Sequence, residues 1–85
     1  MNYSLFILKG VIKELGNLQK KDYIKIKRKI KKLIENPRPT GCKKLKGREG
    51  WRIREGNYRI IYEINDKDKK VVVLHVGLRK DIYRK

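Results

Sequence analysis

The hairpin that decides the fold is Trp51-Arg52-Ile53-Arg54-Glu55-Gly56-Asn57-Tyr58-Arg59-Ile60-Ile61-Tyr62-Glu63-Ile64. Its first residues alternate apolar and charged side chains, as in a strand with one face in the core and the other exposed. Gly56 and Asn57 predict a tight turn. Trp51–Glu55 and Asn57–Ile64 are therefore expected to be antiparallel strands. Convergent arginines on the outer face, with a tyrosine nearby, suit the binding of a phosphodiester.

Several other side chains of these strands have an ordinary structural interpretation. Tyr58 and Tyr62 recur at the period of a strand and are expected in the core, as is Trp51. Arg59 points away from these tyrosines and is expected near an edge of the sheet. His75 lies inside a third predicted strand and is expected to be a core or sheet-packing residue rather than a catalytic one.

The chain before the hairpin predicts one strand and two helices. Tyr3–Leu8 is almost continuously apolar, which predicts a strand buried on both faces. Apolar residues at helical spacing predict a first helix over Gly10–Leu18. Asp22 is the expected N-cap of a second helix, which Asn36-Pro37 ends. The two helices are expected to form an antiparallel hairpin.

The remaining segments complete the predicted topology. Thr40–Gly50 is a basic loop punctuated by glycine, and Lys70–Val76 is the last strand. The order is β-α-α-β-β-β, which predicts an α+β fold: one mostly antiparallel sheet with the helical hairpin packed on one face. The other face would carry Arg52, Arg54 and Arg79. Eighty-five residues are expected to form one domain, 1–85.

The bulk composition points to an anionic partner. The formal net charge is +16, and 40% of the residues are charged, yet 39% are hydrophobic, which is enough for a folded core. Cys42 is the single cysteine, which excludes an internal disulfide and indicates no metal site. No segment is apolar over the length of a membrane span. A cytoplasmic protein without cofactor or metal is expected.

Four segments together resemble the RelE branch of the RelE/ParE toxin superfamily over essentially the whole chain. They are Lys44-Leu45-Lys46-Gly47, Trp51-Arg52-Ile53-Arg54, Asn57-Tyr58-Arg59-Ile60-Ile61-Tyr62-Glu63-Ile64, and Val76-Gly77-Leu78-Arg79-Lys80-Asp81-Ile82-Tyr83. The resemblance implies the RelE/ParE fold, which is similar to that of microbial RNases. It also implies a toxin of a type II toxin–antitoxin system that cleaves mRNA in the ribosomal A site and inhibits translation.

The resemblance also implies a reaction and its partners. A ribose 2′-hydroxyl attacks the adjacent phosphorus and leaves a 2′,3′-cyclic phosphate, so the enzyme would be a metal-independent endoribonuclease. The expected partners are the ribosome, mRNA and a cognate acidic RelB-like antitoxin. Operator DNA would be bound only through the antitoxin complex, and no membrane is involved.

Five residues match positions that the family uses in catalysis. Arg52 and Arg54 match two basic residues that are typically lysines, and Arg59 matches the arginine that would clamp the scissile phosphate. Arg79 would stabilise or protonate the leaving oxygen, and Tyr83 would stack on or orient a base. Because arginine stays protonated, an arginine at the position of the usual base leaves the general base unassigned.

Further cations are candidates for RNA or ribosome binding. Contacts to phosphates release counterions and are blind to sequence. The loop before the hairpin and the C-terminal motif supply Lys43, Lys44, Lys46, Arg48 and Lys80. Each of these side chains also has a simpler interpretation as a solvated surface charge.

Two other functions stay open at this stage. A ParE-like gyrase inhibitor would share the fold and needs no RNA-cutting cluster, so the arginines and Tyr83 argue against it. A basic RNA- or ribosome-binding module with little or no catalysis is compatible with the replacement of lysine by arginine. Its signature would be salt-dependent binding without cleavage.

Overall fold

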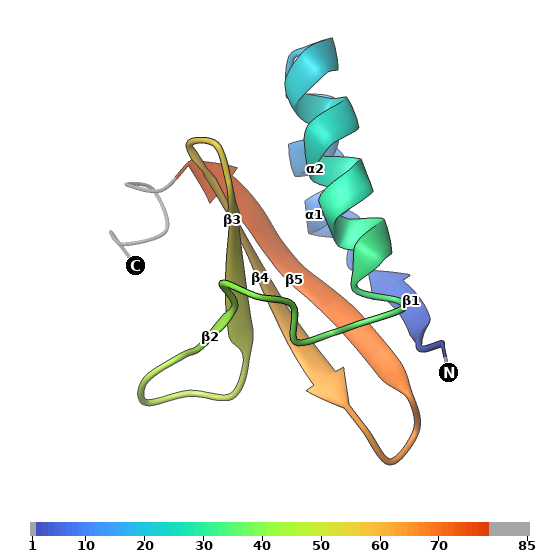
Figure 1. Cartoon of the computed structure of the whole chain (residues 1–85). Helices are drawn as coiled ribbons and strands as arrows, with labels where there is room; N and C mark the ends of the chain where they lie inside the picture. The colour runs from blue at the N-terminus through green and yellow to red at the C-terminus, as the bar shows by residue number, and fades with distance from the viewer. Residues whose placement is uncertain (1, 79–85) are drawn as a thin grey trace.

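A mixed five-stranded sheet carries both helices on one side (Figure 1). The computed structural model describes residues 2–78. The strands lie in the order β1-β5-β4-β3-β2; β1 and β5 pair in parallel, and the other neighbours are antiparallel. This arrangement confirms the predicted α+β fold. The elements are β1 (Ser4–Ile7), α1 (Lys9–Gly16), α2 (Lys20–Lys32), β2 (Lys43–Lys44), β3 (Trp51–Glu55), β4 (Tyr58–Asn65) and β5 (Lys70–Leu78).

The β3–β4 hairpin forms where the sequence predicts it. Glu55 pairs with Tyr58 across a two-residue connection, Gly56-Asn57. Gly56 has a φ of 60°, a left-handed conformation that glycine adopts without steric penalty. The register places apolar residues opposite one another, as in the pair of Ile53 and Ile60. One face of the hairpin therefore belongs to the core.

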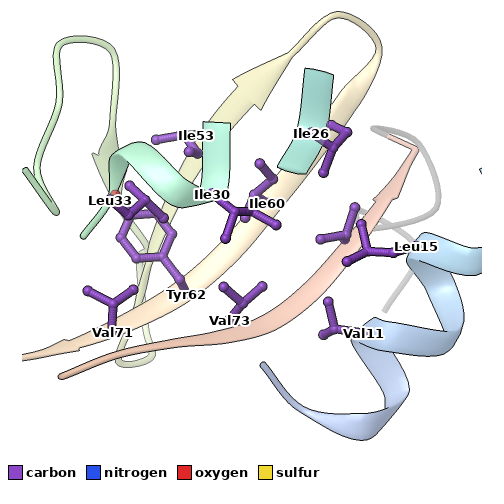
Figure 2. Packing of buried hydrophobic residues seen from close by; sticks show 11 residues of the cluster. Val11, Leu15, Ile26, Ile30, Leu33, Ile53, Ile60, Tyr62, Val71 and Val73 are labelled. Carbon is purple, nitrogen blue, oxygen red and sulfur yellow. The ribbon is translucent and has the colours of Figure 1, made fainter. Parts of the chain in front are cut away.

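The core lies between this face of the sheet and the two helices (Figure 2). Removal of these side chains from water is the main favourable contribution to folding. Tyr62 is fully buried, and Tyr58 and Trp51 pack against the cluster, which confirms the three predictions. The buried members of the cluster are Val11, Leu15, Ile26, Ile30, Leu33, Ile53, Ile60, Tyr62, Val71, Val73 and Val76.

The first strand is buried on one face only, which corrects the prediction for Tyr3–Leu8. Leu5 and Ile7 are half-buried, whereas Ser4 and Phe6 are exposed, and 47% of Phe6 is accessible. The strand lies at the edge of the sheet, and the helices cover one of its faces. Its apolar outer side chains therefore remain at the surface.

Both helices begin earlier than predicted. α1 starts at Lys9 directly after the strand and ends at Gly16, two residues before the predicted end. α2 starts at Lys20, and its N-cap residue is Gln19, which makes no side-chain capping bond. Asp22 is therefore not the N-cap. It lies in the first turn of α2, where its carboxylate accepts a hydrogen bond of 3.3 Å from the Tyr58 hydroxyl.

The predicted loop Thr40–Gly50 contains an additional short strand. Lys43 pairs with Arg52 and Lys44 with Trp51, so β2 becomes the edge beside β3. β5 also continues to Leu78, two residues beyond its predicted end. Two residues of strand are too few to produce a recognisable alternation of apolar and polar side chains.

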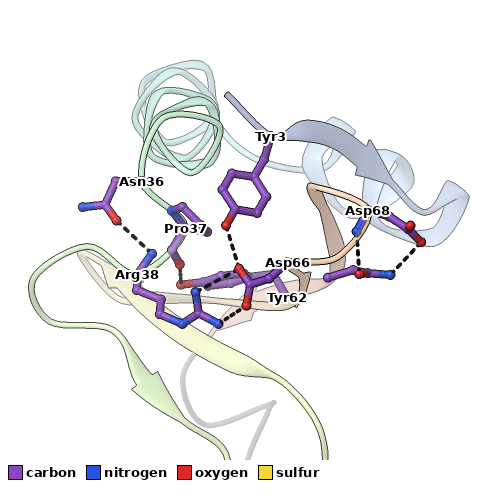
Figure 3. Close-up of polar contacts among 8 residues, drawn as sticks. Tyr3, Asn36, Pro37, Arg38, Tyr62, Asp66 and Asp68 are labelled. Atoms are coloured by element: carbon purple, nitrogen blue, oxygen red, sulfur yellow. Dashed lines mark hydrogen bonds and ion pairs between the residues drawn. The ribbon is translucent and has the colours of Figure 1, made fainter. Parts of the chain in front are cut away.

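A polar cluster joins three distant segments at one end of the sheet (Figure 3). Arg38, from the loop after α2, donates hydrogen bonds of 3.2 and 2.8 Å to the two carboxylate oxygens of Asp66 in the β4–β5 turn. The Tyr3 hydroxyl donates to the same carboxylate at 2.6 Å. The Arg38 guanidinium also lies 5.1 Å from the centre of the Trp51 ring. We name these four residues the Asp66 cluster.

The Asp66 cluster predicts a loss of stability in acid. The hydrogen bonds from Arg38 and then from Tyr3 lower the pKa of Asp66 to about 2. Its unfolded value is about 3.9, so the folded state binds the proton more weakly. The stabilisation is present above pH ~4 and is lost as the pH falls towards ~2. Thermal unfolding followed by circular dichroism should show this loss in the wild type and not in Asp66→Asn.

Asp68→Asn is the matched control for this prediction. It removes a carboxylate from the same turn, and Asp68 contacts Asn65 rather than Arg38. This variant is expected to keep the acid dependence of the wild type. An equal acid dependence in Asp66→Asn and the wild type would contradict the role assigned to Asp66.

Candidate nucleic-acid interface

The register of β3 and β4 brings three arginines to the face of the sheet that the helices leave open. Trp51 pairs with Tyr62 and shares the core face, so the neighbouring residues face the other way. Arg52 pairs with Ile61 on that other face, and Arg54 pairs directly with Arg59. The structure therefore brings Arg52, Arg54 and Arg59 together; we name this surface the arginine face.

Arg59 is buried in the middle of the sheet, which corrects the expectation that it lies near an edge. β4 is a central strand, and Arg59 lies between Arg54 on β3 and Gly77 on β5. Its side chain is only 1% exposed, whereas Arg54 is exposed. Like charges directly opposite one another and buried charges both disfavour folding.

The lysines and arginine of the loop before β3 divide between two surfaces. Lys43 pairs with Arg52 and extends the arginine face, whereas Lys44 pairs with Trp51 and lies on the opposite side. Lys46 and Arg48 are exposed in the connection between β2 and β3. The candidates Arg79, Lys80 and Tyr83 lie outside the described residues, which end at Leu78.

A β-bulge in β5 adds a histidine to the arginine face. Tyr62 pairs with Val73 while Ile61 pairs with His75, so Leu74 is an extra residue in the strand. The bulge reverses the side to which the following residues point. His75 therefore shares the face of Ile61, so of the two predicted positions, in the core or packed on the sheet, the core position is wrong.

A carboxylate from α1 fixes this histidine. Within residues 2–78, β1 pairs with β5 only as far as Val73, and no other strand borders the next part of that edge. Glu14 covers that edge: its Oε1 accepts a hydrogen bond of 3.1 Å from the Val76 N–H, and its Oε2 lies 2.8 Å from His75 Nδ1. Sequence reasoning missed this pair because no local pattern relates Glu14 to His75.

The hydroxyl groups of two buried or part-buried tyrosines hold their protons tightly. Burial raises the pKa of Tyr62, whose hydroxyl donates a hydrogen bond of 2.7 Å to the Pro37 carbonyl (Figure 3). Burial, followed by the nearby charge of Asp22, raises the pKa of Tyr58. Both phenols therefore stay protonated at neutral pH. Neither is a candidate general base for chemistry at the arginine face.

The described residues offer no metal site and no membrane span. Within residues 2–78, no group of three or more His, Cys, Asp or Glu side chains could hold a metal ion. No helix in this range is long and apolar enough to cross a membrane.

Comparisons with known proteins agree with this geometry. The family model described as ParE toxin of type II toxin-antitoxin system, parDE, matches residues 7–83. A protein named RelE1 from Methanocaldococcus jannaschii is 31% identical over 88 residues, which cover 99% of this chain and 98% of that relative.

Solved structures show the same relationship. RelE in the crystal structure of the archaeal RelE–RelB complex from Pyrococcus horikoshii OT3 has a TM-score of 0.83 and 34% identity, covering 93% of this chain and 97% of that chain. The isolated E. coli RelE toxin has a TM-score of 0.78 and 28% identity, covering 96% of this chain and 92% of that chain.

These matches span nearly the whole chain, and the chain belongs to the RelE/ParE superfamily of toxins from type II toxin–antitoxin systems. Within that superfamily it is a RelE-like toxin, since its relatives and structural neighbours carry that name. The resemblance drawn from the sequence is confirmed.

Proposed function

We propose that this toxin is a ribosome-dependent endoribonuclease that cleaves mRNA in the ribosomal A site and so inhibits translation. The observation that supports the proposal is the strand register, which gathers Arg52, Arg54 and Arg59 on one open face of the sheet. Guanidinium groups bind phosphate oxygens through paired hydrogen bonds and stabilise the charge that develops during attack on phosphorus.

The proposed reaction uses the RNA itself as the nucleophile. The 2′-oxygen attacks the adjacent phosphorus, the 5′-oxygen leaves, and a 2′,3′-cyclic phosphate remains, so the chemistry requires no metal or cofactor. Arg59 would clamp the scissile phosphate, with Arg52 and Arg54 beside it. Because Arg59 is 1% exposed, the groups that cover it must move before it can contact RNA.

Residues outside the described range complete the proposal. Arg79 would stabilise the charge on the leaving oxygen, and Tyr83 would stack on or orient a base. Both assignments rest on the resemblance of the motif after Gly77 to that of the family. Neither proposed role involves a residue of the hydrophobic core.

The ribosome would supply the orientation that so small an enzyme lacks. Holding the RNA in line for attack can contribute about 7–11 kcal/mol to lowering a barrier. The cations proposed to contact RNA or the ribosome are Lys43, Lys44, Lys46, Arg48 and Lys80. Such a toxin would act in the cytoplasm, where translation occurs.

An acidic RelB-like antitoxin is the proposed protein partner. An apolar groove of about 380 Å³ runs between β1, α1 and α2, with Ile12 and Tyr23 in its wall and Lys27 and Lys31 at its rim. An amphipathic acidic segment would match both the apolar wall and the cationic rim. The toxin would reach operator DNA only through this antitoxin. Inhibition of the cleavage assay by added antitoxin is the measurement that checks the partner.

Primer extension on an mRNA translated by purified ribosomes tests the proposed function. The wild type is expected to produce cuts that are absent when the same RNA is incubated without ribosomes. Arg52→Ala/Arg54→Ala is expected to weaken these cuts strongly, because two phosphate-binding groups are removed. Lys9→Ala/Lys13→Ala removes the same charge from α1 and is the matched control. Absence of cuts from folded wild-type toxin would contradict the proposal.

Because the matching family model is described as a ParE toxin, a ParE-like activity is the second candidate function. ParE-like proteins share this fold, and inhibition of DNA gyrase is the alternative. A supercoiling assay with purified gyrase separates the two: inhibition of supercoiling without ribosome-dependent cuts would favour the ParE-like function. Binding to ribosomes without cleavage would instead indicate a basic module with little catalysis.

A further inference from the structure

The imidazole of His75 lies beside the point at which Arg59 leaves its strand. Gly77 pairs with Arg59 across the β4–β5 ladder. A Cβ atom at Gly77 would lie 3.1 Å from His75 Nε2, so the ring occupies the space that a side chain at Gly77 would fill. Side chains on paired residues emerge about 4.5–5.5 Å apart on the same face. His75 Nε2 therefore lies on the arginine face, beside the point at which the Arg59 side chain leaves β4.

The other ring nitrogen is held by a fixed carboxylate. Glu14 Oε2 lies 2.8 Å from Nδ1, while Oε1 accepts the hydrogen bond from the Val76 N–H. An ionised carboxylate only accepts hydrogen bonds, so this contact assigns a proton to Nδ1. In the neutral ring the lone pair then lies on Nε2, the nitrogen that faces Gly77. The pair has the arrangement of an oriented proton acceptor.

We propose that His75 is the general base of the cleavage reaction and that Glu14 positions it; this inference rests on the proposed ribonuclease function. Nε2 takes the proton of the 2′-hydroxyl, and the 2′-oxygen forms a bond to phosphorus. The bond from phosphorus to the 5′-oxygen breaks with its electron pair, and that oxygen takes a proton from solvent water. The hydroxide left behind is neutralised by the protonated imidazole.

Other side chains on this face are unsuited to the role. Arginine stays protonated in proteins, which excludes Arg52, Arg54 and Arg59. Histidine ordinarily changes its charge between about pH 5 and 8. His75 is within reach of solvent, because 27% of its side chain is exposed. Among residues 2–78, the charged groups that face it from the elements packed against it are Glu14 from α1 and Arg59 from β4.

Single-turnover cleavage on programmed ribosomes, followed from about pH 5 to 8, tests the assignment. His75→Gln is expected to lower the rate by about 10²–10⁴-fold and to abolish the fall in rate at low pH. Glu14→Gln is expected to lower the rate less than His75→Gln does, because His75 is still present. The fall in rate at low pH is expected to change, because the charged carboxylate no longer contacts the ring. Val72→Ala, a half-buried change on the same face of β5, is expected to keep both the rate and the profile.

The outcomes separate this inference from the function on which it rests. Wild-type toxin that cuts no RNA on ribosomes would overturn the ribonuclease function, and the general base with it. Wild-type toxin that cuts, with His75→Gln retaining its rate and pH profile, would overturn the assignment of His75 alone.

Nitrogen NMR of the His75 ring provides a test that needs no cleavage. The neutral ring in the free toxin is expected to carry its proton on Nδ1 rather than on Nε2. Glu14→Gln is expected to increase the population of the other tautomer. A wild-type ring with the proton predominantly on Nε2 would overturn the proposal.

Discussion

Arg59→Met is expected to lower the rate of ribosome-dependent mRNA cleavage by about 10²–10³-fold, the effect of removing one donor that stabilises a developing oxyanion. Methionine fills much of the same space without a charge, and the site is only 1% exposed. The loss should appear in the single-turnover rate at saturating ribosome concentration. At saturation the rate reports the chemical step rather than binding, and Arg59 is proposed to act in the chemical step, on the scissile phosphate.

Arg54→Met is the matched control for this change. It removes the same charge from the residue directly opposite Arg59, at an exposed position. A smaller loss of rate is expected, because a solvated guanidinium stabilises a charge less than a desolvated one. Equal losses in the two variants would contradict a special role for the buried arginine. Chemical denaturation of both variants verifies that they remain folded.

Ile26→Ala is expected to lower the free energy of unfolding by about 2–5 kcal/mol. Ile26 is fully buried between α2 and the sheet, so the substitution leaves a cavity (Figure 2). A domain of this size has a total stability of about 5–15 kcal/mol, and this loss is a large part of it. Denaturation by urea, monitored by circular dichroism, measures the change.

Ile24→Ala provides the comparison within the same helix. Ile24 lies two residues earlier in α2, and 44% of its side chain is exposed. Its replacement leaves no cavity, and alanine favours helix slightly more than isoleucine does. The stability is therefore expected to change by less than about 0.5 kcal/mol. Similar losses at both positions would contradict burial as the cause of the loss at Ile26.

The sequence predicts the parts of the fold that depend on neighbouring residues. The alternation in Trp51–Glu55 and the turn at Gly56-Asn57 predict the hairpin, and the pairing of Arg54 with Arg59 follows from its register. Asn36-Pro37 lies just beyond the end of α2, as expected for a residue pair that cannot continue a helix. Local patterns thus predict most of the elements and two members of the arginine face.

The errors arise where distant segments decide the outcome. Phe6 is exposed because its strand lies at an edge, and edge position is a property of the whole sheet. His75 changes face because of the bulge at Leu74, which has no signature in the alternation of side chains. Glu14 covers the β5 edge only after α1 has packed beside it. Each of these three features depends on the pairing or packing of segments that are far apart in the sequence.

The position of β5 between β1 and β4 has a consequence for how the toxin is made. Ser4 pairs with Lys70, so β1 has its partner in β5, which is synthesised after the other strands of residues 2–78. While residues 70–78 remain inside the exit tunnel of the ribosome, β1 has no neighbour, one edge of β4 is open and Gly77 is not yet opposite Arg59. Pairings between distant segments form late. The sheet is therefore complete only after β5 has left the tunnel, and until then the arginine face lacks His75 and Gly77.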